Sequence, residues 1–389
     1  MVNINLISAI IFYALIILVI IIYRKKFDIY AKIVALYRTK IGIKTIDRIA
    51  CCCPGVWKVL GYIGIYIGFI GMIFIFAYMI HSLYKLAVNP AAQAAIALVV
   101  PGIRIPGSPV FIPFWYGIIS LFLVVLIHEA AHGVIARAYN LKINNTGVGM
   151  FAIFPIAFVE PDEKKLRKRS VKQQLSIYAA GPFSNIISAV IIFFVAGLVV
   201  LPIAMSNVNP TGAEIVSFEK GFPAEASGLQ RGEIITSVNN VPITSVANFT
   251  YEMDKLSVGD TVLIQTAENQ YSVKTASSPA NASKAYAGVY VSQHIDLKPE
   301  VADKYGNLPW LWFYLFRFLQ WFFILSAGIG LANLLPLGPV DGGRMLLTGL
   351  GKVFKNNTAY TIWKYISYLT LLLLIMNFVY PYLRNISFT

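Results

Sequence analysis

Charged residues are scarce in this sequence: Asp, Glu, Lys and Arg together make up 13% of the 389 residues, whereas hydrophobic residues make up 57%. Soluble domains carry about 25% charged residues, so the composition excludes an ordinary soluble protein and indicates a membrane protein. The formal net charge of +14 does not indicate nucleic-acid binding, because the basic residues cluster beside apolar segments, where Lys and Arg set membrane orientation. We therefore expect no nucleic-acid partner.

Cysteine is equally scarce, and its three copies are consecutive at positions 51–53. Neighbouring cysteines do not easily bridge one another, which excludes a disulfide framework. A plain apolar cluster is the preferred interpretation, and a lipid attachment site is the alternative. The apolar stretch from Leu6 to Tyr23 lacks a charged start and a small-residue cleavage site, so we predict a retained span and not a signal peptide.

Long apolar runs, by contrast, are abundant. A membrane-spanning helix needs about 20 mostly apolar residues. Six segments meet this requirement: 5–23, 57–82, 114–139, 173–203, 309–336 and 359–383. A further apolar stretch at 91–100 is too short to cross a bilayer, and we assign no role to residues 86–113. The sequence thus predicts an α-helical polytopic membrane protein with about six transmembrane helices.

Basic residues after the first and third predicted spans predict the orientation. The first loop holds Arg24, Lys25, Lys26, Lys32, Arg38, Lys40, Lys44, Arg48 and Lys58, and the second holds Lys164, Lys165, Arg167, Lys168, Arg169 and Lys172. An excess of Lys and Arg marks cytoplasmic loops. The N-terminus is then outside, and the long insert 204–305 is external.

The insert has the composition of a different kind of structure. Short alternating runs such as Thr261–Thr266 are typical of half-buried strands, and turn signals such as Asn239-Asn240 separate them. We predict one small β-rich domain. The expected organisation is two accessory N-terminal helices (1–85), the first part of a membrane core (86–203), the external domain (204–298) and the second part of the core (299–389).

The chemistry-bearing motif is His128-Glu-Ala-Ala-His132, which follows the apolar run Phe114 to Ile127. Two histidines four residues apart on a helix point the same way and can share one metal ion. Glu129 is then placed to take a proton from water on that metal. A chance origin is disfavoured, because each of these side chains is costly in a hydrophobic helix.

Two histidines make an incomplete site, because catalytic zinc usually takes three protein ligands. The spare histidines, His81 and His294, lie in no motif. Asp341 is the better candidate, since it follows a break in the fifth span at 336–339, and a carboxylate in lipid is costly unless it is paired or metal-bound. The predicted orientation brings both motifs toward the cytoplasmic side. A helix cap is the alternative role for Asp341.

At these motifs the chain resembles the site-2 proteases, zinc metalloproteases that cut within membranes. The hallmark is the His-Glu-x-x-His helix with a distant Asn-x-x-Pro-x-x-x-x-Asp-Gly segment, here Asn333 to Gly342. The resemblance covers residues 114 to 350 and implies one Zn²⁺ per chain, held by His128, His132 and Asp341. It also implies that Glu129 is the catalytic base and that Asn333 helps to bind substrate or the oxyanion. Val340 departs mildly from the leucine of many members.

Three other segments extend the resemblance. Gly181 and Asn185 match a Gly-Pro-x-x-Asn motif on the next core helix, where Gly181 would allow close helix contact and Asn185 could hydrogen-bond near the site; joining two helices is the alternative role for Asn185. Residues 221–240 resemble a PDZ domain, although Glu233 and Asn240 depart from the usual Asp and Gly. PDZ domains bind peptides by adding a strand to a sheet edge, so a peptide ligand is one expected partner.

Residues 146–160 are rich in glycine, β-branched and aromatic residues, which favour extended chain. The resemblance implies a small membrane-facing sheet here. We expect its free edge to receive substrate in extended form, because edge pairing replaces the backbone hydrogen bonds that a helix loses on unwinding. A purely structural hairpin is the alternative.

Together these features predict an intramembrane zinc metalloprotease with an inserted PDZ-like domain. We expect it in a multi-pass cell membrane, acting on transmembrane proteins or peptides within the lipid bilayer, with its active site toward the cytoplasm. A metal-ion transporter is disfavoured because no repeated halves are visible. An inactive scaffold acting through the PDZ-like domain is disfavoured by the intact His, Glu and Asp residues.

Overall fold

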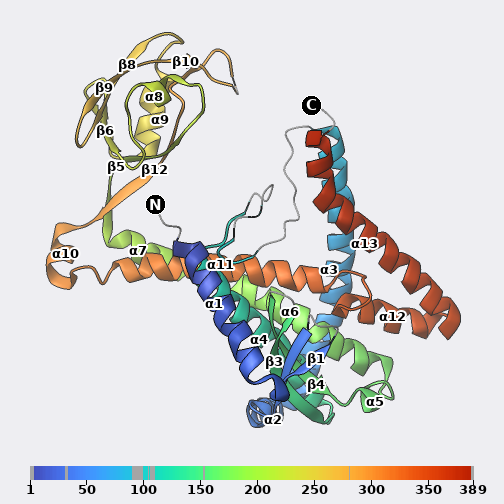
Figure 1. Ribbon diagram of the computed structural model, residues 1–389. Helices are drawn as coiled ribbons and strands as arrows, with labels where there is room; N and C mark the ends of the chain where they lie inside the picture. Colours follow the sequence, from blue (N-terminus) through green and yellow to red (C-terminus); the bar gives the residue numbers. More distant parts are fainter. Residues whose placement is uncertain are drawn as a thin grey trace. The chain divides into compact units, whose positions relative to one another are not determined.

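The computed structural model describes residues 4–30, 34–89, 100–103, 105, 110–151, 154–279 and 281–386. The chain divides into two compact units, Met1–Ala196 with Phe316–Thr389, and Gly197–Leu315 (Figure 1). The apolar stretch predicted at 91–100 lies, apart from its last residue, outside the described residues.

Six helices are long and apolar enough to cross a membrane. They are α1 (Ile4–Ile22), α3 (Pro54–Val88), α4 (Phe114–Ala138), the continuous helix Val171–Ser206, α11 (Trp310–Asn333) and α13 (Asn356–Ile386). The fourth comprises α6 (Val171–Val195), the π-helical turn η2 (Ala196–Val200) and α7 (Leu201–Ser206). The prediction of a polytopic helical protein with a β-rich insert is confirmed, and the protein is an integral membrane protein.

Glycines on α3 let that helix pack closely within the membrane unit. A Cβ added at Gly64 would contact Phe183 of α6 at 3.3 Å, and one added at Gly61 would contact Ser176 at 3.1 Å. Small residues at helix contacts allow two backbones to approach closely. In lipid this close packing matters because no hydrophobic effect drives the helices together. Helix α4 contacts α3, α6 and the short helix α2 (Ile43–Cys52), so it lies within the bundle.

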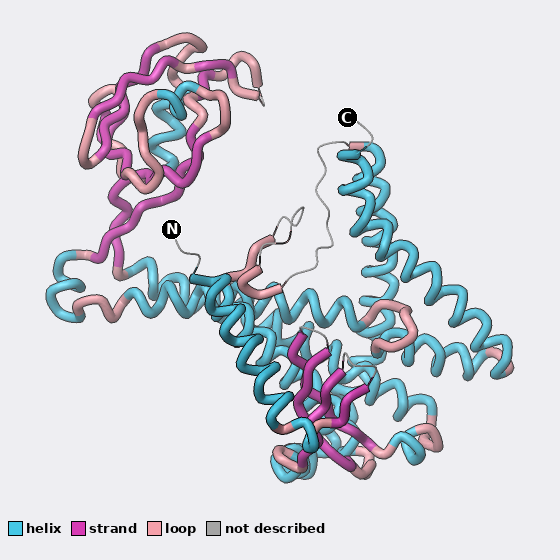
Figure 2. Tube along the Cα trace, in the orientation of Figure 1, coloured by secondary structure: helices cyan, strands magenta, loops and turns pink. Residues whose placement is uncertain are grey.

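A four-stranded antiparallel sheet lies against α4 in the same unit (Figure 2). Its order is β1 (Asp28–Tyr30), β2 (Val34–Thr39), β3 (Ile143–Phe151) and β4 (Phe154–Pro161). The extended chain expected at 146–160 is therefore present at 146–151 and 154–160. Strands β1 and β2 come from the basic loop after the first span, for which the sequence predicted only a location. Within the described residues, β4 ends the strand order and has one free edge.

The insert unit is built on a six-stranded sheet of order β12-β5-β6-β8-β9, with β7 paired to β6. The sheet strands are β5 (Val208–Phe218), β6 (Ile234–Val238), β7 (Val241–Pro242), β8 (Thr261–Thr266), β9 (Gln270–Lys274) and β12 (Val289–Leu297). The short strands β10 (Ala276–Ser277) and β11 (Ala285–Tyr286) pair with each other, and the helices are α8 (Pro223–Ala226), α9 (Val246–Asp254) and α10 (Pro299–Tyr305). Its core is apolar and includes the fully buried Ile215, Ile235 and Ile264.

Candidate metal centre

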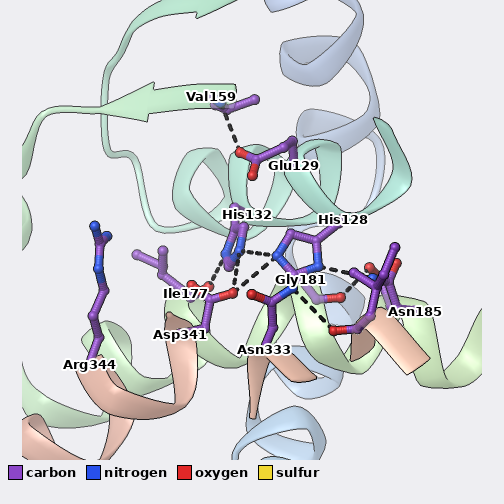
Figure 3. Close-up of polar contacts among 12 residues, drawn as sticks. His128, Glu129, His132, Val159, Ile177, Gly181, Asn185, Asn333, Asp341 and Arg344 are labelled. Atoms are coloured by element: carbon purple, nitrogen blue, oxygen red, sulfur yellow. Dashed lines mark hydrogen bonds and ion pairs between the residues drawn. The ribbon is translucent and has the colours of Figure 1, made fainter. Parts of the chain in front are cut away.

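Helix α4 brings the two histidines of the motif onto one buried face. His128 is 6% exposed and His132 is 9% exposed, and their Nε2 atoms lie 3.2 Å apart. Oδ2 of Asp341 lies 3.0 Å from Nε2 of His128 and 3.3 Å from Nε2 of His132. Figure 3 shows both imidazoles pointing toward Asp341. The ligand atoms of these three residues all lie within 4.8 Å of one another and could hold a metal ion.

The outer nitrogens of the two rings are also held. Nδ1 of His132 lies 2.6 Å from the carbonyl oxygen of Ile177. Because a carbonyl can only accept, the hydrogen of a neutral His132 ring is on Nδ1, and the lone pair of Nε2 faces the cluster. Nδ1 of His128 lies 3.0 Å from Nδ2 of Asn185, which is fully buried on α6. Partners on the second ring nitrogen are typical of metal-binding histidines.

A sharp chain reversal delivers Asp341. Helix α11 ends at Asn333, a turn follows, and Asp341 is the first residue of α12 (Asp341–Val353). Gly342 makes the reversal tight, since a Cβ there would lie 2.5 Å from the carbonyl oxygen of Leu335. In the Asp-Gly pair, Asp341 offers a ligand oxygen and Gly342 allows the tight packing of the turn.

Gly181 lets the two imidazoles lie close against helix α6. A Cβ added at this position of α6 would lie 2.5 Å from Nε2 of His128 and would also overlap Nε2 of His132. Both imidazole nitrogens therefore lie where a larger residue would place its side chain, and the close packing depends on glycine here. Two imidazole nitrogens and one carboxylate oxygen are a donor set that fits a tetrahedral zinc ion with one position left open.

Glu129 and Asn333 face a cavity of about 300 Å³, which His128, His132 and Asp341 also line. Oε2 of Glu129 accepts a hydrogen bond from the backbone N–H of Val159 on β4, with an N···O distance of 2.9 Å. Asn333 donates through Nδ2 to the carbonyl oxygen of Ile329, one turn back on α11, at 3.1 Å.

All seven residues that the sequence singled out lie around this one cavity or its buried wall. Sequence reasoning missed Val159 and Ile177, which contribute backbone atoms that no residue type announces. It also missed Arg344, which lines the cavity and forms an ion pair with Glu163 at 3.5 Å. Its position three residues after Asp341 was the available signal, because such residues share a helix face.

The profile of peptidase family M50 matches residues 116–376, well over half of the chain. An uncharacterized protein of Methanocaldococcus jannaschii is 28% identical over 319 residues, covering 80% of this chain and 76% of that protein. Zinc metalloprotease RasP of Oceanobacillus iheyensis is 22% identical, covering 50% of this chain and 55% of its own length.

A membrane-bound transcription factor site-2 protease homolog of Arabidopsis thaliana is 24% identical, covering 49% of this chain and 36% of that protein. Among solved structures, the PDZ domain of an SdrC-like protein from Listeria innocua is similar at 27% identity and a TM-score of 0.19. That match covers 21% of this chain and 96% of the PDZ chain.

Proposed function

Because this chain belongs to peptidase family M50, we propose that it is a zinc metalloprotease that hydrolyses peptide bonds in or near transmembrane segments of membrane proteins. The observation that carries the proposal is the convergence of Nε2 of His128, Nε2 of His132 and Oδ2 of Asp341 within 3.3 Å of one another in the membrane unit. Ionisable groups in a membrane protein are costly and mark functional sites.

His128, His132 and Asp341 are the residues that would hold zinc. When bound, zinc lowers the pKa of water and stabilises negative charge on a carbonyl oxygen. Glu129 accepts the proton of the attacking water and passes it to the leaving nitrogen. Since its Oε2 accepts the Val159 N–H, Oε1 is the oxygen that exchanges the proton. The Nδ2 group of Asn333 leaves the carbonyl oxygen of Ile329 and donates instead to the substrate carbonyl oxygen as that oxygen gains negative charge.

Asn185 selects the hydrogen position on His128. Its Oδ1 is buried and has no hydrogen-bond partner in the described part of the chain, while Nδ2 faces the ring. Turning the carboxamide over lets Oδ1 accept a hydrogen from Nδ1 of His128. The lone pair of Nε2 is then directed at the cluster, which metal binding requires.

The free edge of β4 is the proposed substrate track, and its hydrogen-bonding capacity is limited. Alternate amides of a strand point to opposite edges, so positions 155, 157, 159 and 161 share the free edge. Pro155 and Pro161 have no N–H, and the N–H of Val159 is taken by Glu129. Ala157 is left as the donor, so a substrate pairs over a short extended segment centred there. An unwound helical peptide thereby regains part of its lost hydrogen bonding.

The proposed orientation puts this site toward the cytoplasm and the β-rich insert outside, where the insert binds a peptide. The exposed cysteines at 51–53 allow this membrane orientation to be tested. In right-side-out vesicles, a membrane-impermeant maleimide should label the chain only after permeabilisation. Ser283→Cys, placed in the exposed part of the insert after the three cysteines are replaced by serine, should be labelled before it. The reverse pattern rejects the orientation.

Purification in detergent tests the function directly. We expect about one zinc ion per chain and cleavage of a model single-span substrate. Glu129→Gln should retain the zinc and lose the cleavage, because the amide cannot accept the proton. A Glu129→Gln protein that cleaves at the wild-type rate contradicts the role of Glu129. Zinc flux in proteoliposomes without cleavage would identify a transporter. A protein that shows neither zinc flux nor cleavage would be a scaffold.

A further inference from the structure

Residues from the N-terminal part of the chain support the contact between Val159 and Glu129. We propose that the backbone N–H of Val159 is the positioning contact for the Glu129 carboxylate, and that the ion pair between Arg38 and Glu160 holds this N–H in place. The inference rests on the proposed function of Glu129 as the base. It adds a role for β1 and β2, which precede residue 116, where the family match begins.

The direction of the Val159 amide is set by the sheet. Val159 lies opposite Thr146 of β3, yet its N–H reaches Oε2 of Glu129 at 2.9 Å. An N–H points one way, so this amide leaves the sheet at the free edge of β4. Its side chain packs on the α4 face, since a Cβ at Gly133 would contact Cγ1 of Val159 at 3.3 Å. Figure 3 shows Glu129 pointing toward Val159.

The contact restrains a side chain that would otherwise be mobile. Glutamate has three rotatable side-chain bonds, and fixing them costs conformational free energy. One hydrogen bond to a charged carboxylate is stronger than a neutral one and favours a single arrangement. With Oε2 engaged, Oε1 is the oxygen left for the cavity that Glu129, His128 and Asp341 line.

Glu160 locks the strand beside this amide. Its carboxylate accepts from Nε of Arg38, at 3.0 Å to Oε1 and 3.2 Å to Oε2, and Nη2 of Arg38 lies 2.9 Å from Oε1. Nδ2 of Asn145 on β3 donates to Oε2 at 2.9 Å. Arg38 also pairs with Asp28 on β1. One guanidinium therefore ties β4 to β1 and β2.

Glycine makes the long reach across β3 feasible. Arg38 lies opposite Gly147, and Gly147 lies opposite Phe158, so the three form one row on one face of the sheet. Gly147 has no side chain to block the row, and the guanidinium lies 6.0 Å from the centre of the Phe158 ring. Glu160, two residues on, shares this face. The ion pair therefore lies on the face opposite the Val159 side chain and does not touch α4.

Val159→Pro removes the one N–H and leaves the β3–β4 ladder intact. Pro155 and Pro161 already occupy the same edge of β4, so the strand accepts proline at this parity. We expect kcat for a single-span substrate to fall about tenfold or more, with KM and zinc content unchanged. Val159→Ala keeps the N–H and trims the side chain, so kcat should fall much less than in Val159→Pro. Equal kcat for the two variants overturns the proposal.

Hydrogen exchange provides a readout that needs no cleavage. In the full-length protein, Glu129→Ala should remove protection from the Val159 amide while the ladder amide of Phe158 keeps it. Arg38→Ala should also speed exchange at Val159, because the strand end is released. Unchanged protection at Val159 in Glu129→Ala overturns the contact. A wild-type protein that cleaves nothing refutes the proposed function instead, and the exchange result still decides the contact.

Discussion

The two compact units bury polar side chains for different purposes. In the insert unit the core around Ile215, Ile235 and Ile264 is apolar, and the buried Thr266 and Thr275 hydrogen-bond to backbone carbonyls of nearby turns. Both contacts stay within the insert unit. The insert thus follows the ordinary rule that buried polar groups are hydrogen-bonded and the fold is held by apolar contacts.

The membrane unit instead gathers polar side chains from distant segments. His128, His132, Asn185 and Asp341 come from three helices and contact one another. This arrangement is costly where water is absent. We therefore expect substitutions in this polar cluster to reduce zinc binding and cleavage. Substitutions in the insert core should lower the stability of the insert unit only.

The largest effect is expected at the third ligand. Asp341→Ala removes the oxygen that contacts both histidines, leaving two donors where zinc needs three. Metal analysis should find little zinc, and cleavage of a single-span substrate should be lost. Asp303→Ala, in α10 of the insert unit, is the matched carboxylate control and should keep both. Full zinc content in Asp341→Ala would break the comparison.

Gly181→Ala should have the next largest effect. The added methyl group would lie 2.5 Å from Nε2 of His128, so a ring or the helix must move, and we expect zinc affinity to fall about tenfold or more. Gly197→Ala is the control, because a Cβ there meets nothing within 4 Å. A competition titration with a chelator measures both. Equal affinities would show that the close contact between Gly181 and the histidines does not hold the site.

A core mutation in the insert should sharpen the comparison from the other side. Ile235 is fully buried, and Ile235→Ala should destabilise the insert unit by about 2–5 kcal/mol. Limited proteolysis of the full chain should then cut within the insert sooner than in the wild type. Zinc content should not change. Zinc loss on this substitution would mean that the two units depend on each other.

The smallest effect concerns pH and the sheet that supports Glu129. Burial raises the pKa of Glu160, but hydrogen bonds from Arg38 and Asn145 outweigh it, so the pKa lies below its ordinary value of 4.5. A depressed pKa means that the ion pair stabilises the fold above pH 4.5 and that this contribution is lost as pH falls through the folded-state pKa.

Thermal unfolding of wild type and Glu160→Gln at about pH 6 and about pH 3 tests this linkage. The wild type should lose more of its Tm than Glu160→Gln, which has no proton to take up at this position. The difference should be small, because the pair is partly exposed. An identical loss in both proteins would show that the pair does not contribute.

The sequence predicted the spans and the polar cluster because both depend on residue type. Apolar runs of sufficient length mark helices in lipid. Side chains such as His128, Glu129 and Asp341 cost free energy in such helices, so their presence indicates a functional site. Gly181 was expected as a helix contact, and it also lets the histidine nitrogens lie against α6.

Pairings between distant segments could not be predicted in the same way. Arg38 and Glu160 are 122 residues apart, and basic residues near a membrane already have an explanation in orientation. Val159 and Ile177 act through backbone atoms, which every residue carries. Such contacts follow from strand register and helix packing, and a single sequence does not specify either.

X-ray absorption on the zinc-loaded protein tests the central claim most directly. The account predicts a first shell of two imidazole nitrogens and oxygen at about 2.0–2.2 Å, with the imidazole signal lost in His132→Ala. A shell containing sulfur at about 2.3 Å would place the metal on the cysteines at 51–53. That result would contradict a zinc centre formed by His128, His132 and Asp341.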